Sequence, residues 1–141
     1  MFHDAVETPG ELSTEELVAV YERQILERVE AVGRASALSD TDLDPGRLDA
    51  VLAGDVAGLT LADGAALLAL EGAASAEEIA MLARDALLMG MTTAVMDVEK
   101  LAGELDSGLT AREIQAKVEG RFPMTLREFA QLHGFLSART S

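Results

Sequence analysis

Basic and amide side chains gather in the last third of the chain, within LTAREIQAKVEGRFPMTLREF. Arg, Lys and Gln donate hydrogen bonds to phosphate oxygens and to base edges, so these residue types suit contact with nucleic acid. From Leu109 onward the net charge is +2, whereas residues 1–108 carry −16. The candidate DNA contacts are Arg112, Gln115, Lys117, Arg121 and Arg127. The alternative is that these side chains pair with Glu113, Glu119 or the acidic remainder of the chain.

Other chemistry that the residues could perform lacks the required spacing. The chain has no Cys, which excludes disulfides, thiolate catalysis and Cys-based metal sites. Its two His, His3 and His133, lie in no zinc or di-iron motif, and we expect His133 to pack half-buried beside Phe129. No spacing assembles a Ser-His-Asp triad, and no Gly-rich phosphate loop follows a strand. We therefore expect no enzymatic activity, no cofactor, no metal site and no small-molecule substrate.

One acidic stretch, DTDLDPGRLDAV, imitates the start of a calcium-binding loop, with Asp40, Asp42 and Asp44 at alternate positions. Pro45 stands where the sharp turn of such a loop needs Gly, and Val51 stands where the bidentate Glu belongs. The stretch is better interpreted as a capping turn.

The longest uniform element is a helix expected over Ser75–Leu105. Ser75 and Glu78 form a capping box, and apolar residues then recur at spacings of three and four. No charged residue lies between Asp85 and Asp97, which predicts a helix covered on several sides at the centre of the domain. Its methionines are expected to fill the core, and Gly90 to admit a closely crossing helix.

The remaining elements are also helices. Caps and Gly stops predict them over 13–33, 45–53, 60–72, 110–120 and 125–138, with a short helix near 35–38. No stretch alternates in the manner of a strand. The sequence thus predicts an all-α fold of about six helices, with a loose N-terminal arm over 1–12 and a single domain over 13–141.

An internal repeat is visible when Leu43–Leu70 is laid over Leu109–Phe135. Leu59-Thr60-Leu61 falls on Met124-Thr125-Leu126, and Gly54 falls on Gly120. Upstream, Val29 and Val32 fall on Val95 and Val98. The match predicts two related units, at about 13–72 and 75–138, around the central helix. The alternative is that any two capped, amphipathic helix pairs align this well.

Each unit has a short helix, a Gly, a loop and an apolar-Thr-Leu helix start, and so resembles the repressor-type (Cro-like) helix-turn-helix. The resemblance implies that Pro45–Ala53 and Ala111–Glu119 would be the helices that enter the major groove. The first of these, PGRLDAVLA, lacks the side chains used for base readout, whereas the second carries Arg112, Gln115 and Lys117.

The bulk charge is the most unusual property of the composition. The chain has 25 Asp and Glu against 11 Lys and Arg, a net of −14, with 49% hydrophobic residues. This balance is typical of a salt-adapted protein; the alternative is an acidic protein that binds basic partners. The stretches LLMGMTTAVMDVEKLA and EIQAKVEGRFPMTLREFAQLHGFL resemble a family of haloarchaeal proteins of unknown function. That resemblance implies a haloarchaeal source and no particular activity.

Together these features predict a cytoplasmic, non-enzymatic interaction or scaffold module of a salt-adapted archaeon, with a protein partner or a second copy of itself and no membrane association. The alternative is a DNA-binding transcriptional regulator that uses residues 109–136.

Overall fold

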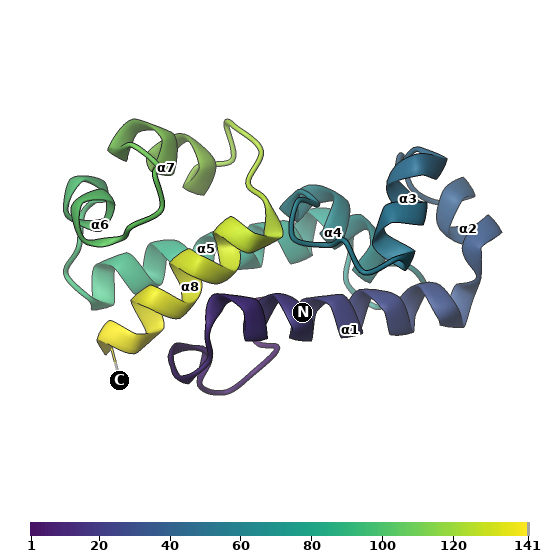
Figure 1. Ribbon diagram of the computed structural model, residues 1–141, viewed down its shortest axis with the longest axis horizontal. Helices are drawn as coiled ribbons and strands as arrows, with labels where there is room; N and C mark the ends of the chain where they lie inside the picture. Colours follow the sequence, from purple (N-terminus) through teal and green to yellow (C-terminus); the bar gives the residue numbers. More distant parts are fainter. Residues whose placement is uncertain (141) are drawn as a thin grey trace.

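The computed structural model describes residues 1–140, and within them it contains helices and no strands (Figure 1). A 3-10 helix, η1 (Pro9–Glu11), precedes eight α-helices: α1 (Thr14–Val32), α2 (Arg34–Ser39), α3 (Pro45–Leu52), α4 (Leu61–Leu68), α5 (Ala76–Thr93), α6 (Val98–Glu104), α7 (Ala111–Val118) and α8 (Leu126–Thr140). They form one compact, elongated domain with α2 and α3 at one end, α6 and α7 at the other, and α4 and α8 between. The all-α prediction is confirmed, but eight helices replace the six expected.

Side-chain caps begin the helices where the sequence predicts them. In α1, the Ser13 hydroxyl accepts from the Glu16 N–H at 3.1 Å, and the Glu16 carboxylate accepts from the Ser13 N–H at 3.0 Å. The same reciprocal pairing begins two later helices, at Thr110 with Glu113 and at Thr125 with Glu128. These bonds satisfy backbone amides that have no partner within the helix.

The expected central helix over Ser75–Leu105 is two helices, α5 and α6, bent by 88°. The Met96 N–H donates to the Met91 carbonyl at 2.9 Å, and Val95 between them has a φ of +55°. This is a Schellman turn, whose left-handed position usually holds Gly, so Val95 gives the sequence no stop signal. The second extra element is α2, which is longer than the short helix expected near 35–38. No single helix within residues 1–140 is long and apolar enough to cross a membrane.

The core lies where α1 and α5 each pack against both α4 and α8. Gly90 of α5 faces Leu136 of α8, and a Cβ at position 90 would lie 3.2 Å from the Leu136 Cβ. The predicted close crossing at Gly90 is therefore present. It is made by α8, which brings the end of the chain across the middle of α5.

A short backbone bridge joins the loops that precede α4 and α8. The Leu61 N–H donates to the Met124 carbonyl at 2.6 Å, and the Leu126 N–H donates to the Leu59 carbonyl at 2.8 Å. Thr60 and Thr125 lie opposite each other in this isolated antiparallel bridge. The bridge pairs the two triplets that the sequence alignment matches, and it fixes the starts of α4 and α8 side by side.

The first twelve residues, expected to form a loose arm, pack against the rest of the molecule. Phe2 is 1% exposed, and its ring meets the Tyr21 ring edge-on at 5.3 Å between centroids. η1 lies on α8, where a Cβ at Gly10 would come within 2.5 Å of the Ala138 backbone nitrogen. The missing periodicity of this segment reflects irregular backbone, and Phe2 and Pro9 are nevertheless buried.

Candidate functional site

The five residues predicted to contact DNA do not form one free basic face. Arg112, Gln115 and Lys117 lie on α7, Arg121 lies in the following loop, and Arg127 lies on α8. The Gln115 amide donates to Glu119 at 3.3 Å, and the Arg121 guanidinium donates to the same carboxylate at 2.8 Å.

Arg127 pairs with a carboxylate of another helix, whereas Arg112 has no partner within the described residues. The Arg127 guanidinium lies 2.8 Å from the Glu15 carboxylate of α1. A hydrogen bond from the Glu15 backbone N–H lowers the pKa of that carboxyl most, and the bond from Arg127 lowers it further. Arg112 is exposed and has no hydrogen-bond or ionic partner within the described residues. It is the one predicted contact of the five that needs no exchange of partners to reach a ligand.

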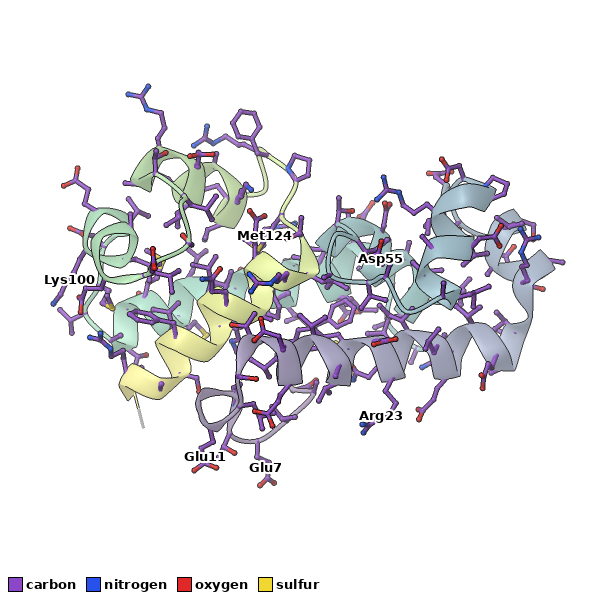
Figure 2. All side chains as sticks on the ribbon, in the orientation of Figure 1. Glu7, Glu11, Arg23, Asp55, Lys100 and Met124 are labelled. Carbon is purple, nitrogen blue, oxygen red and sulfur yellow. The ribbon has the colours of Figure 1, made fainter. Side chains whose placement is uncertain are left out.

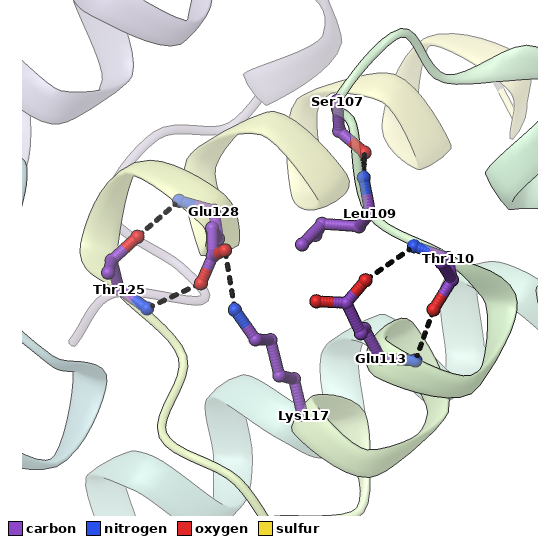
Figure 3. Close-up of polar contacts among 7 residues, drawn as sticks. All are labelled: Ser107, Leu109, Thr110, Glu113, Lys117, Thr125 and Glu128. Atoms are coloured by element: carbon purple, nitrogen blue, oxygen red, sulfur yellow. Dashed lines mark hydrogen bonds and ion pairs between the residues drawn. The ribbon is translucent and has the colours of Figure 1, made fainter.

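Lys117 holds α7 to the start of α8 (Figure 3). Its ammonium lies 2.6 Å from one carboxylate oxygen of Glu128, and the other oxygen of Glu128 accepts from the Thr125 N–H at 3.0 Å. Only 17% of the Lys117 side chain and 21% of the Glu128 side chain are exposed. One carboxylate thus caps α8 and neutralises a half-buried cation, which gives Lys117 a structural role.

Cations from both halves of the chain meet in a cleft of about 340 Å³ between α4, α5 and the α7–α8 loop. Arg84, Lys117 and Arg121 line this cleft, as do Thr60, Leu61, Ala62, Gly120, Phe122, Pro123 and Met124. No Asp or Glu is among the lining residues. We call it the Arg84 cleft. A concentration of three cations is unexpected on a chain of net charge −14.

Arg84 is the cleft residue that the sequence analysis missed. It lies on α5, and its side chain packs over Gly120, where a Cβ would come within 3.1 Å of the Arg84 Nε. Within residues 1–140 no carboxylate pairs with it. The available signal was that Arg84 is the one cation of α5 in an acidic half of the chain, but its neighbours from α7 are set by tertiary packing.

A second surface is the outer side of α5, which the sequence wrongly places inside the core. Ile79, Ala80, Ala83 and Leu87 are buried, and the opposite side carries exposed apolar residues. We define the α5 face as Met81 (49% exposed), Leu88 (45%), Met89 (70%) and Val95 (80%). The prediction that the methionines fill the core is therefore correct for Met96, which is buried, and wrong for Met81 and Met89, which are exposed.

Two threonines make the α5 face more apolar than its composition indicates. The Thr92 hydroxyl donates to the Leu88 carbonyl at 3.1 Å, and the Thr93 hydroxyl donates to the Met89 carbonyl at 2.8 Å. Thr side chains inside helices commonly bond back to the carbonyl one turn earlier in this way. Because both hydroxyls are occupied within the helix, the surface from residue 86 to residue 96 offers methyl and thioether groups and no charge.

His133 contributes packing. The His133 ring stacks on the Phe129 ring with centroids 5.1 Å apart, and burial lowers the pKa of His133. This matches the half-buried position expected for it. No group of three or more His, Asp or Glu side chains in the described part of the chain is placed to hold a metal ion.

The fold and its surfaces define a single-domain, all-helical protein with one apolar helix face and one cationic cleft. The chain belongs to the Family of unknown function (DUF5791), whose model matches residues 17–139. No curated protein and no solved structure matches the chain. The family match runs from the first turn of α1 to the last turn of α8 and so includes both surfaces.

Proposed function

We propose that this protein is a non-enzymatic interaction module that binds a protein partner through the α5 face. The observation that carries the proposal is the exposure of Leu88, Met89 and Val95 within one short stretch, residues 86 to 96, that has no charged residue. Contiguous exposed apolar surface rimmed by polar residues is typical of an interaction site. Methionine suits such a surface because its side chain adapts to the partner.

The charges around the α5 face define the chemistry of the partner. Acidic residues outnumber basic ones on both sides of the uncharged stretch from 86 to 96. Glu77, Glu78 and Asp85 precede it with Arg84, and Asp97 and Glu99 follow it with Lys100. An amphipathic helix with an apolar stripe and flanking Lys or Arg matches this arrangement. A second copy of the chain is a poorer match, because pairing two α5 faces brings acidic groups together.

Two synthetic helical peptides test this proposal, with the same Leu stripe flanked by Lys in one and by Glu in the other. Fluorescence anisotropy in the lowest salt at which circular dichroism shows the protein folded should show that the Lys peptide binds more tightly, because higher salt screens the charges of the two flanks. Leu88→Gln with Met89→Gln should abolish binding, whereas Leu52→Gln, an exposed apolar residue on α3, should not. Equal loss in both variants, or equal binding of both peptides, would contradict the proposal. If analytical sedimentation shows that the parent protein is a dimer and that the α5 variant is a monomer, the partner at the α5 face is a second copy of the chain and not a basic helix.

DNA binding through residues 109–136 is the second candidate function. It is supported by Arg112, which is exposed and unpaired among the described residues, and by the net charge of +2 from Leu109 onward. Gln115, Lys117, Arg121 and Arg127 are each bonded to a carboxylate, so contact with DNA requires these bonds to be exchanged. The α5 face needs no such exchange, and we therefore rank it first.

Anisotropy with sheared genomic DNA at several molar-range salt concentrations tests the second candidate. Saturable binding should disappear in a triple variant that combines Arg112→Glu, Arg121→Glu and Arg127→Glu, and it should persist in Arg23→Glu on α1. Absence of binding at every salt concentration at which the proteins remain folded would eliminate it.

We also infer that the two halves are duplicated units that fold around each other. In support, α3 and α7 are each followed, two residues after their last helical residue, by a glycine, Gly54 and Gly120, with φ values of +97° and +80°. The bridge also joins equivalent triplets. The buried Leu17, Tyr21 and Ile25 of α1 correspond to Ile79, Ala83 and Leu87 of α5, a shift of 62 residues. The proposed match of Val29 and Val32 with Val95 and Val98 is wrong, because Val95 lies outside a helix. Since each long helix packs on the last helix of the other unit, residues 13–72 and 75–138 should gain helical circular dichroism only when mixed.

We further propose that the acidic surface adapts the protein to concentrated salt. The support is the excess of 25 Asp and Glu over 11 Lys and Arg on a compact, well-packed fold. Close acidic side chains repel one another unless salt screens them. Dialysis from molar to dilute salt should therefore unfold the protein, and full stability in dilute buffer would contradict this proposal.

A further inference from the structure

We propose that the Arg84 cleft binds a nucleotide, with the phosphates among Arg84, Lys117 and Arg121 and the base against Phe122. The proposal concerns a small-molecule site and goes beyond the partner binding proposed for the α5 face. It begins from the lining of the cleft, which contains three cations and no carboxylate on a strongly acidic molecule.

Arg84 is the residue that marks the cleft as a ligand site. Within residues 1–140 no hydrogen bond or ion pair engages its guanidinium, although the side chain is only partly exposed. Its position is nevertheless defined, because it packs over Gly120 at the end of α7. A planar guanidinium can donate two parallel hydrogen bonds to a phosphate group. We expect a phosphate-binding Arg to be held in position and to have no carboxylate partner before the phosphate binds.

Two further cations converge on the same space. The Lys117 ammonium bonds Glu128, which lies outside the lining, and the ammonium retains further donor capacity. The Arg121 guanidinium bonds Glu119 at 2.8 Å, with 60% and 44% of the two side chains exposed. An ion pair this exposed contributes little, so Arg121 can turn toward a phosphate at small cost.

The backbone of α4 adds a donor. Leu61 and Asp63 direct their N–H groups to the Met124 carbonyl and the Thr60 hydroxyl, whereas the Ala62 N–H has no acceptor in the part of the chain described. Ala62 lines the cleft. Free amides at the start of a helix bind anionic oxygens, so this group complements the cations without being the basis of the proposal.

Phe122 is the residue that favours a nucleotide over a bare polyphosphate as the ligand of the cleft. Its side chain is 59% exposed at the lining of the cleft, beside Pro123, where solvent exposure of an aromatic ring has no structural benefit. An aromatic ring beside a group of cations offers a base a stacking surface next to its phosphates. The volume of about 340 Å³ lies within the range of small-ligand sites.

Isothermal titration calorimetry of the full chain with ATP, tripolyphosphate and adenosine tests the proposal, in the lowest salt at which circular dichroism shows the protein folded. ATP should bind with one site per chain and more tightly than tripolyphosphate, and adenosine should bind weakest. Arg84→Gln should weaken ATP binding about tenfold or more, because one charge-assisted contact is removed. Phe122→Ala should bring ATP to the affinity of tripolyphosphate.

Arg23→Gln is the matched control, since Arg23 points away from the core on α1 (Figure 2) and lines no part of the cleft. It should bind ATP as the parent does. In amide NMR spectra, the signals of Ala62 and Gly120 should shift with ATP, and they report the site even if a variant is destabilised. No heat with ATP, equal weakening by Arg23→Gln, or shifts confined to Arg112 and its neighbours would overturn the proposal. Equal affinity for ATP and tripolyphosphate would overturn the nucleotide assignment.

Discussion

The Lys117 ammonium and the Glu128 carboxylate lie 2.6 Å apart between α7 and α8, with about four-fifths of each side chain buried. Replacing Lys117 by Met keeps most of its apolar stem but leaves the Glu128 charge, which is largely buried, without its cation. We expect Lys117→Met to lower the free energy of unfolding by about 1–2 kcal/mol, between the values typical of exposed and of buried pairs.

A double-mutant cycle with Glu128→Gln isolates this interaction, measured by urea unfolding in constant salt. The amide of Gln keeps the acceptor for the Thr125 N–H, so the helix cap survives while the charge is removed. The two changes should be less costly together than the sum of the single changes. Additive effects would show that the pair contributes nothing beyond its separate contacts.

Val95 is a β-branched residue with a φ of +55°, and its side chain is exposed. The left-handed conformation costs an L-residue roughly 1–2 kcal/mol, and Gly adopts it freely. Val95→Gly should therefore raise the free energy of unfolding by about 1 kcal/mol while weakening binding of the Lys-flanked peptide to the α5 face. Val98→Gly, at the start of α6, should lower stability instead. A loss of stability in Val95→Gly would show that the turn is not strained.

The contrast between Val95 and the predicted caps shows which parts of the fold can be predicted from the sequence. Ser13, Thr110 and Asp44 cap helices through residues three positions away, so their patterns can be found by reading the sequence. The end of α5 has no such local signature, because tertiary packing of Met96 and α6 imposes the turn on a valine. The basic cluster of the last third was likewise visible, and Glu119 was named among its possible partners, as the structure shows for Gln115 and Arg121. Glu128 and Glu15 were not named individually, because tertiary packing brings them to Lys117 and Arg127.

The Arg84 cleft illustrates the same limit. Arg84 and Lys117 are 33 positions apart, and only the packing of α5 against α7 brings them together. The apolar run in α5 correctly predicted a helix, but composition cannot distinguish a covered helix from one with an uncovered face. Both candidate surfaces therefore depend on tertiary packing that periodicity does not encode.

The N-terminal segment depends on a glycine. A Cβ at Gly10 would lie 2.5 Å from the Ala138 nitrogen and 2.7 Å from its Cα, and these backbone atoms belong to α8 and cannot move aside. Gly10→Ala should separate η1 from α8 and cost about 1–3 kcal/mol. Gly46→Ala is the control, since its nearest atom lies 3.9 Å away and α3 should tolerate or gain from the change. Faster hydrogen exchange in residues 2–12 of the Gly10 variant alone is the expected readout, and unchanged exchange would contradict the close contact.

Tyr21 predicts how the protein responds to alkaline pH. Its ring packs between Phe2 and Phe129, and its hydroxyl has no hydrogen-bond partner within residues 1–140. Burial raises the pKa of this phenol well above its usual value of 10.0. The folded state therefore keeps the proton while the unfolded state releases it. Ionisation of Tyr21 therefore does not reduce the free energy of unfolding below pH 10.0, and it reduces that free energy progressively as the pH rises above 10.0.

Because the chain has one Tyr and no Trp, phenolate absorbance reports this single group. In the folded protein the absorbance should rise together with loss of helical circular dichroism, in one transition above pH 10.0. Tyr21→Phe removes both the ionisable group and an unpaired buried hydroxyl, so it should stabilise the protein by about 1 kcal/mol at neutral pH and move alkaline unfolding upward. Phenolate absorbance that appears near pH 10.0 with the helices intact would show that the hydroxyl reaches solvent or water in the folded state.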